Sequence, residues 1–169
     1  GPLAPRNVSL EQAAQSGNTV AQSELALQRL SAGRSGEGVQ LLRRSAERFG
    51  QRRAIAWAVG DATDALTYQQ TLDAAQHIAF WLLQQAGPGE RISVWSRNTV
   101  EWALLELGCA LAGMVVAAWN PGWRDPECEH ACELAGPSVI LAGQDTRGEP
   151  LLERARQIAG DIPVFALDD

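Results

Sequence analysis

Apolar residues recur at helical spacing soon after residue 38. Within residues 39–49 they stand one to four positions apart, with arginine and glutamate between them, and Gly50 follows. This period is typical of a helix that buries one face, and a glycine commonly ends such a helix. We therefore predict a helix over residues 39–49.

The later apolar runs are short and predict strands. They fall at residues 54–59, 65–67, 91–96, 114–119, 138–142 and 163–167. Turn residues 60–64 separate the first two, which favours a hairpin. Helical patterns lie between the others, at residues 67–87, 102–112, 125–136 and 150–159.

Strand and helix thus alternate four times at close spacing. This order predicts an α/β fold, with a layered and mostly parallel sheet and flanking helices. The run 114–119 is apolar at every position. Because a strand covered on both faces has this composition, we predict it as a central strand.

Three polar residues are predicted to cap the helices. Thr67 stands three residues before Gln70, the spacing of a capping box, and Asn98 stands three residues before Glu101. Asp125 precedes a proline, a combination typical of a helix start.

Residues 1–37 are predicted to be separate from the α/β unit at 38–169. They begin with Gly1-Pro2-Leu3, which we interpret as a tag remnant, and continue with a helix over 6–31 and a Gly/Ser-rich linker over 31–38. The linker is not predicted to bind phosphate, because no strand precedes its glycines and no lysine follows them. Since no initiator methionine is present, we expect a piece of a longer protein.

The composition argues against two classes of function, nucleic-acid binding and membrane spanning. The 169 residues carry a net charge of −6, and all 14 basic residues are arginine. This acidic balance argues against a nucleic-acid surface. Residues 107–123 form the longest uncharged apolar stretch, but Asn120, Pro121 and three glycines interrupt it, so we expect no membrane span. Three cysteines are too few for a disulfide framework, which favours the cytoplasm.

The motif at Cys128, His130 and Cys132 resembles a set of metal ligands. On a helix the two cysteines share one face, whereas His130 points about 160° away from them. We therefore predict no metal site and interpret the cysteines as core residues. His77 and His130, the only histidines, are predicted as surface or boundary residues, and no nucleophile motif accompanies either. No catalytic residue is predicted in this chain.

Tryptophans surround one predicted turn. Trp119 and Trp123 stand on either side of Asn120, Pro121 and Gly122, after the strand at 114–119. The carboxyl ends of strands face the ligand crevice in open α/β sheets. Trp119 is therefore either a core anchor or part of a ligand wall.

The ordered series of short motifs over residues 38–169 resembles the acyl-CoA synthetases and related adenylate-forming (AMP-binding) enzymes. The matching segments are Leu41 to Gly50, Ala54-Ile55, Leu66 to Tyr68, Gly89 to Val94, Asn98 to Glu101, Ala110 to Val116, Asn120-Pro121, Glu133 to Ala135 and Val139 to Leu141. They resemble the first part of the large N-terminal domain of that family.

The resemblance implies a ligase of carboxylic acid metabolism. Such enzymes use ATP and Mg²⁺ to convert a carboxylate to an acyl-adenylate, which coenzyme A then attacks to form a thioester. The family's phosphate-binding motifs and lysines are absent from this chain, so we expect it to be inactive alone and to bind none of these molecules. Its partners would be the remainder of the parent chain and, in the complete enzyme, the carboxylic acid and coenzyme A.

The resemblance also implies which residues lie near coenzyme A. Trp119, Asn120 and Pro121 correspond to the turn beside the pantetheine channel, and Arg147 is the best match for an arginine that contacts the nucleotide phosphate. A guanidinium suits that role because it binds phosphate through paired donors. A solvent-exposed loop arginine is the alternative.

Two other functions are compatible with the sequence. One is an adenylation domain that loads a carrier protein, and the other is a non-catalytic α/β module that binds or interacts. We also expect an exposed sheet edge, which favours self-association.

Overall fold

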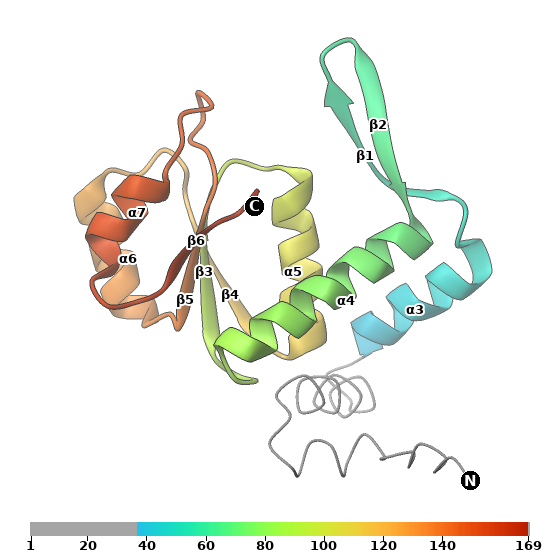
Figure 1. Cartoon of the computed structure of the whole chain (residues 1–169), viewed down its shortest axis with the longest axis horizontal. Coiled ribbons are helices and arrows are strands. Elements are labelled where there is room, and N and C mark those ends of the chain that lie inside the picture. The colour runs from blue at the N-terminus through green and yellow to red at the C-terminus, as the bar shows by residue number, and fades with distance from the viewer. Residues whose placement is uncertain (1–36, 169) are drawn as a thin grey trace, which may run out of the picture.

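A four-stranded parallel sheet lies at the centre of the computed structural model, which describes residues 37–168 (Figure 1). Its strands are β3 (Arg91–Trp95), β4 (Val115–Trp119), β5 (Val139–Ala142) and β6 (Val164–Ala166), in the order β4-β3-β5-β6. Every neighbouring pair is parallel. The predicted α/β fold is therefore confirmed.

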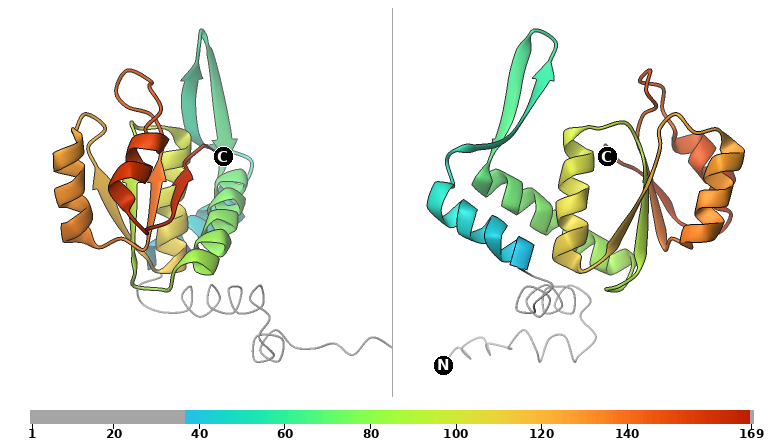
Figure 2. Two further views of the ribbon diagram at one scale, coloured as in Figure 1. Left: turned by 60° about the vertical axis from the view of Figure 1, so that its left-hand side comes forward. Right: turned by 180° about the vertical axis from the view of Figure 1, so that it is seen from behind.

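Helices cover both faces of this sheet. Figures 1 and 2 show α4 (Tyr68–Gln85) and α5 (Val100–Ala112) on one face, and α6 (Asp125–Ala135) and α7 (Leu152–Ala159) on the other. The helix α3 (Glu37–Phe49) packs beside α4. The predicted helix at 6–31 and the Gly/Ser linker lie outside the described residues, apart from the linker's last two positions.

The predicted hairpin comprises β1 (Arg53–Val59) and β2 (Ala62–Thr67). These two strands pair with each other in an antiparallel sheet of their own. Figures 1 and 2 show the hairpin projecting away from the central sheet, beyond the start of α4.

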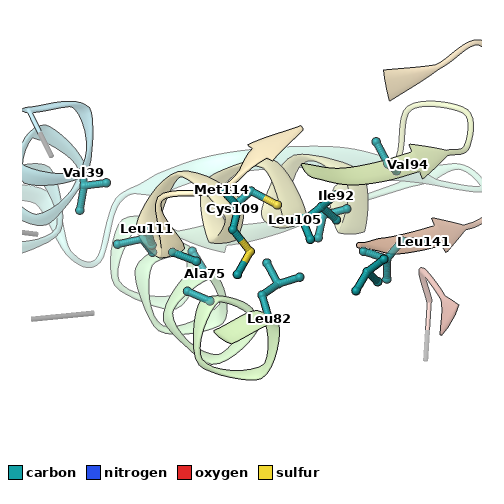
Figure 3. Packing of buried hydrophobic residues seen from close by; sticks show 13 residues of the cluster. Val39, Ala75, Leu82, Ile92, Val94, Leu105, Cys109, Leu111, Met114 and Leu141 are labelled. Carbon is teal, nitrogen blue, oxygen red and sulfur yellow. The ribbon is translucent and has the colours of Figure 1, made fainter. Parts of the chain in front are cut away.

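Alternating side chains divide the core into two clusters. Ile92 and Val94 of β3 face α4 and α5, whereas Trp95 faces α6 and α7. Successive residues of a strand point to opposite faces, so one buried strand serves both clusters. Figure 3 shows the first cluster, in which Leu82 of α4 and Leu105 of α5 pack toward the sheet.

The strand β4 is at an edge of the sheet, so the prediction of a central strand was wrong. The central positions belong to β3 and β5, which are buried along nearly their whole length. Val115 of β4 is 51% exposed. An apolar run shows that a strand could be covered on both faces, but it does not specify how many neighbours the strand has.

Two of the three predicted helix caps are displaced by one residue. Thr67 and Gln70 form the predicted capping box, with Thr67 Oγ1 accepting from the Gln70 amide at 3.2 Å and Gln70 Oε1 accepting from the Thr67 amide at 2.9 Å. The N-cap of α5 is Thr99 instead of Asn98, and its hydroxyl accepts from the Trp102 amide at 3.2 Å. The N-cap of α6 is Arg124, and Asp125 is the first helical residue.

Candidate functional site

Loops at the carboxyl ends of the parallel strands form one edge of the sheet. They follow β3, β4 and β5, and Figure 1 shows them at the upper end of the sheet. Because open α/β sheets bind ligands at this edge, a functional site is expected here. The predicted residues Trp119, Asn120, Pro121 and Arg147 all lie in or beside these loops.

Trp119 at the end of β4 is a core residue with 3% of its surface exposed. Its ring centroid lies 6.0 Å from that of Trp95. Its indole Nε1 has no hydrogen-bond partner among the residues that the structure describes. Of the two roles left open by the sequence, this packing favours the core anchor.

Asn120 and Pro121 form the accessible part of the turn after β4. The Asn120 Oδ1 atom accepts from the Gly122 amide at 2.8 Å, and its carbonyl oxygen accepts from the Trp123 amide at 3.0 Å. The same carbonyl accepts from Trp95 Nε1 at 3.1 Å. The turn is thus held both by its own backbone and by the core of the sheet.

Arg154 is a residue of this edge that the sequence analysis missed. Its guanidinium lies 4.8 Å from the centroid of the Trp95 ring and donates to Asp125 Oδ1 at 2.6 and 2.9 Å. Asp125 therefore links α6 to α7 instead of capping α6. The sequence offered one signal, because Leu151 and Arg154 stand three positions apart in the helix predicted over residues 150–159 and would share a face there.

Arg147 lies in the loop between β5 and α7, and its side chain is 82% exposed. Its Nε atom is 3.5 Å from Asp145 Oδ2. No hydrogen bond or ion pair joins Arg147 to Asn120 or Pro121 within the described part of the chain. The strand β3 lies between β4, which precedes the Asn120 turn, and β5, which precedes the Arg147 loop.

Asp145 organises the loop that carries Arg147. It is 8% exposed, and its Oδ1 atom accepts from the Arg147 amide at 2.8 Å and from the Glu149 amide at 2.9 Å. The hydrogen bond from the Glu149 amide is the largest cause that lowers the pKa of the Asp145 carboxyl, and Arg147 lowers it further. Asp145 is therefore ionised at neutral pH, and Arg147 faces a full negative charge.

The two cysteines of α6 do not form a ligand set with His130. Cys128 and Cys132 are buried, whereas His130 is exposed, as the helical geometry predicted. Burial raises the pKa of the Cys128 thiol to about 11 and also raises that of Cys132. Among residues 37–168, no group of His, Cys, Asp and Glu side chains could hold a metal ion.

A cavity of about 600 Å³ lies on the face of the sheet that α4 and α5 cover. Side chains of α4, α5, β5 and β6 line it, and most of them are apolar. Trp81 and Phe165 meet edge to face at its wall, with ring centroids 4.9 Å apart. His77, predicted as a surface or boundary residue, is exposed at this cavity, and Glu101, which also lines it, is half-buried. No sequence spacing joins these four elements, so the cavity could not be predicted from the sequence.

None of the helices described is both long enough and apolar enough to cross a membrane.

Comparison with known proteins identifies similar chains. The profile of a protein family described as AMP-binding enzyme matches residues 42–168. A CoA ligase of Rhodococcus jostii (strain RHA1) that acts on a methyl-dioxo-octahydroindenyl propanoate is 35% identical over 108 residues, 63% of this chain and 20% of that protein. The human mitochondrial medium-chain acyl-CoA ligase ACSF2 is 24% identical over 73% of this chain and 20% of its own length.

A solved structure shows the same arrangement. The structure of VinN with L-aspartate superposes with a TM-score of 0.65 and 27% identity, covering 76% of this chain and 31% of VinN. The chain thus spans 20% of the length of these two curated relatives and less than a third of VinN.

Proposed function

Because the chain belongs to the AMP-binding enzyme family over residues 42–168, we propose that it is the N-terminal part of an ATP-dependent acyl- or aryl-CoA synthetase. The complete enzyme would join a carboxylate to ATP with release of pyrophosphate, and coenzyme A would then displace AMP to form the thioester. The 35% identity to a CoA ligase is the single observation that best supports a CoA-dependent enzyme.

The residues present fit coenzyme A better than they fit ATP and Mg²⁺. Arg147 offers an exposed guanidinium, and Asn120 and Pro121 form an accessible turn on the same sheet edge. In contrast, the chain contains no lysine, and its described residues hold no carboxylate cluster for a metal ion. We therefore assign the chain a share in holding coenzyme A and none in the chemistry at the ATP phosphates.

The three cysteines, all free and buried, support a reducing compartment, and we propose a cytoplasmic location.

The assignment of Arg147 is tested by R147A in the complete enzyme. We expect the KM for coenzyme A to rise about tenfold with kcat little changed, since a hydrogen-bonded charge pair contributes about 1.5–3 kcal/mol. The matched control is R156A, because Arg156 is an exposed arginine on α7 that pairs with Glu153. An unchanged KM for coenzyme A in R147A would contradict the assignment.

The chain alone is expected to form no acyl-adenylate. Incubation with ATP, Mg²⁺, a panel of carboxylates and hydroxylamine should give no hydroxamate above a blank without protein. Sustained hydroxamate formation would show that these 169 residues contain a complete adenylation site, and the proposal of a partial enzyme would be wrong.

A binding module without chemistry is the second candidate, and the apolar cavity beside Trp81 and Phe165 is the observation that favours it. Titration of the chain with short- and medium-chain carboxylates would separate the two, with Trp fluorescence as the signal. Saturable binding that L104W abolishes would favour the module, because Leu104 lines the cavity. The absence of binding would favour the partial enzyme.

A further inference from the structure

The loop between β5 and α7 is built around one carboxylate. Asp145 donates its backbone amide to the Glu149 carbonyl at 2.8 Å, and its own carbonyl accepts from the Gly148 amide at 3.1 Å. Its Oδ1 atom accepts from the amides of Arg147 and Glu149. The loop is therefore closed by four hydrogen bonds that all involve Asp145.

The two carboxylate oxygens of Asp145 have different partners. Oδ1 binds only backbone amides, whereas Oδ2 lies 3.5 Å from Arg147 Nε. The Asp145 side chain is 11% exposed and that of Arg147 is 82% exposed. The carboxylate thus contacts Arg147 from within the loop, and most of the guanidinium faces solvent.

We propose that Asp145 is a positioning residue that presents Arg147 to the nucleotide phosphate of coenzyme A and also competes with that phosphate for the guanidinium. This inference rests on the proposed function. The Oδ1 contacts hold the backbone from which Arg147 projects, and the Oδ2 charge pairs with the guanidinium when the phosphate is absent. Binding of the phosphate replaces this pair with charge-assisted hydrogen bonds to the exposed guanidinium.

The two roles of Asp145 predict opposite effects of two substitutions. In D145N the amide oxygen still accepts from the backbone amides of the loop, but the competing charge is gone. In D145A both the charge and the backbone contacts are lost. If Asp145 only held the loop, D145N would bind coenzyme A as tightly as the wild type does. If Asp145 also competes with the phosphate, D145N binds coenzyme A more tightly.

The experiment measures the affinity of the complete enzyme for coenzyme A and for 3′-dephospho-coenzyme A, which lacks the nucleotide phosphate. For D145N we expect the Kd for coenzyme A to fall about two- to fivefold, as for an ion pair whose guanidinium faces solvent, with no change for the dephospho form. For D145A we expect a higher Kd for coenzyme A. The control is E149Q, which removes a charge from the same loop at a side chain that forms no ion pair with any residue of 37–168, and it should leave both Kd values unchanged.

The outcomes separate this inference from the proposed function. If R147A leaves the Kd for coenzyme A unchanged, the assignment of Arg147 fails and the inference fails with it. Suppose that R147A raises the Kd for coenzyme A, but that D145N has the wild-type Kd or changes the Kd of both ligands by the same factor. Then only the proposed competition by Asp145 is wrong.

Discussion

Each cysteine of this chain is a core residue. Cys109 of α5 lies in the core cluster with residues of α4 and the sheet, and Cys128 and Cys132 of α6 lie in the second cluster. Burial is the largest cause that raises the pKa of Cys109, to about 12, and the nearby Glu106 adds to it. Because the thiolate is the reactive form, these thiols are protected both by their protonation and by their burial.

Thiol titration tests this view. We expect no cysteine of the folded chain to react rapidly with Ellman's reagent at pH 8, and all three to react in guanidinium chloride. A rapidly reacting thiol in the folded chain would contradict the buried positions.

The raised pKa values of the thiols also make the free energy of unfolding depend on pH. Above about pH 9 the thiols ionise in the unfolded chain but stay protonated in the folded one, so the unfolded chain binds fewer protons. The free energy of unfolding should therefore fall as the pH rises from 9 toward 11 or 12. The C109A variant should show a smaller fall over this range.

Helix packing depends on one glycine in α5. A Cβ atom on Gly108 would lie 2.4 Å from Ile78 Cγ2 and 2.9 Å from Ile78 Cβ of α4. These distances are too short for non-bonded carbons, so α4 and α5 approach as closely as they do because residue 108 has no side chain. A glycine inside a helix otherwise weakens it.

We expect G108A to destabilise the fold by about 1–3 kcal/mol, as overpacking does, although alanine is the better helix former. Thermal unfolding followed by circular dichroism gives the measurement. The matched control is G38A in α3, where a Cβ would meet no atom within 4 Å, so this change should be neutral or slightly stabilising. A G108A variant as stable as wild type would show that α4 and α5 can separate without cost.

At the scale of the whole molecule, the longer edge of the central sheet within the described residues is the apolar strand β4. The edge strand β4 has five uncharged residues, of which Val115 is 51% exposed, whereas β6 at the other edge is three residues long and follows Pro163. Natural sheets usually protect edges with charges, prolines or bulges. We therefore propose β4 as the edge through which this chain would self-associate.

Light scattering on V115K tests this proposal, because a lysine on an edge strand opposes pairing. We expect the wild-type chain to show concentration-dependent association and V115K to show less. The control is L134K, since Leu134 is 79% exposed on α6 and lies on no strand. Equal association of V115K and wild type would exclude β4, and a wild-type chain that stays monomeric would favour the self-standing module.

Local patterns in the sequence were sufficient for the elements and their order. The period of apolar residues specifies helix or strand, and the capping box at Thr67 and Gln70 involves residues three positions apart. Asn98 and Thr99 are both good cap residues, so the choice between them depended on the backbone path from β3 into α5. The sequence thus predicted the alternation of strands and helices, but the ends of the helices only to within a residue.

Only the tertiary structure decided which strand lies at the edge and which residues meet at the ends of the strands. Arg154 reaches Asp125 across 29 positions, and the apolar cavity combines four elements. Asp145 and Arg147 are two positions apart, yet nothing local shows that one is buried and the other exposed. Contacts of this kind depend on how the layers pack, because many strand orders are compatible with the same local pattern of apolar and polar residues.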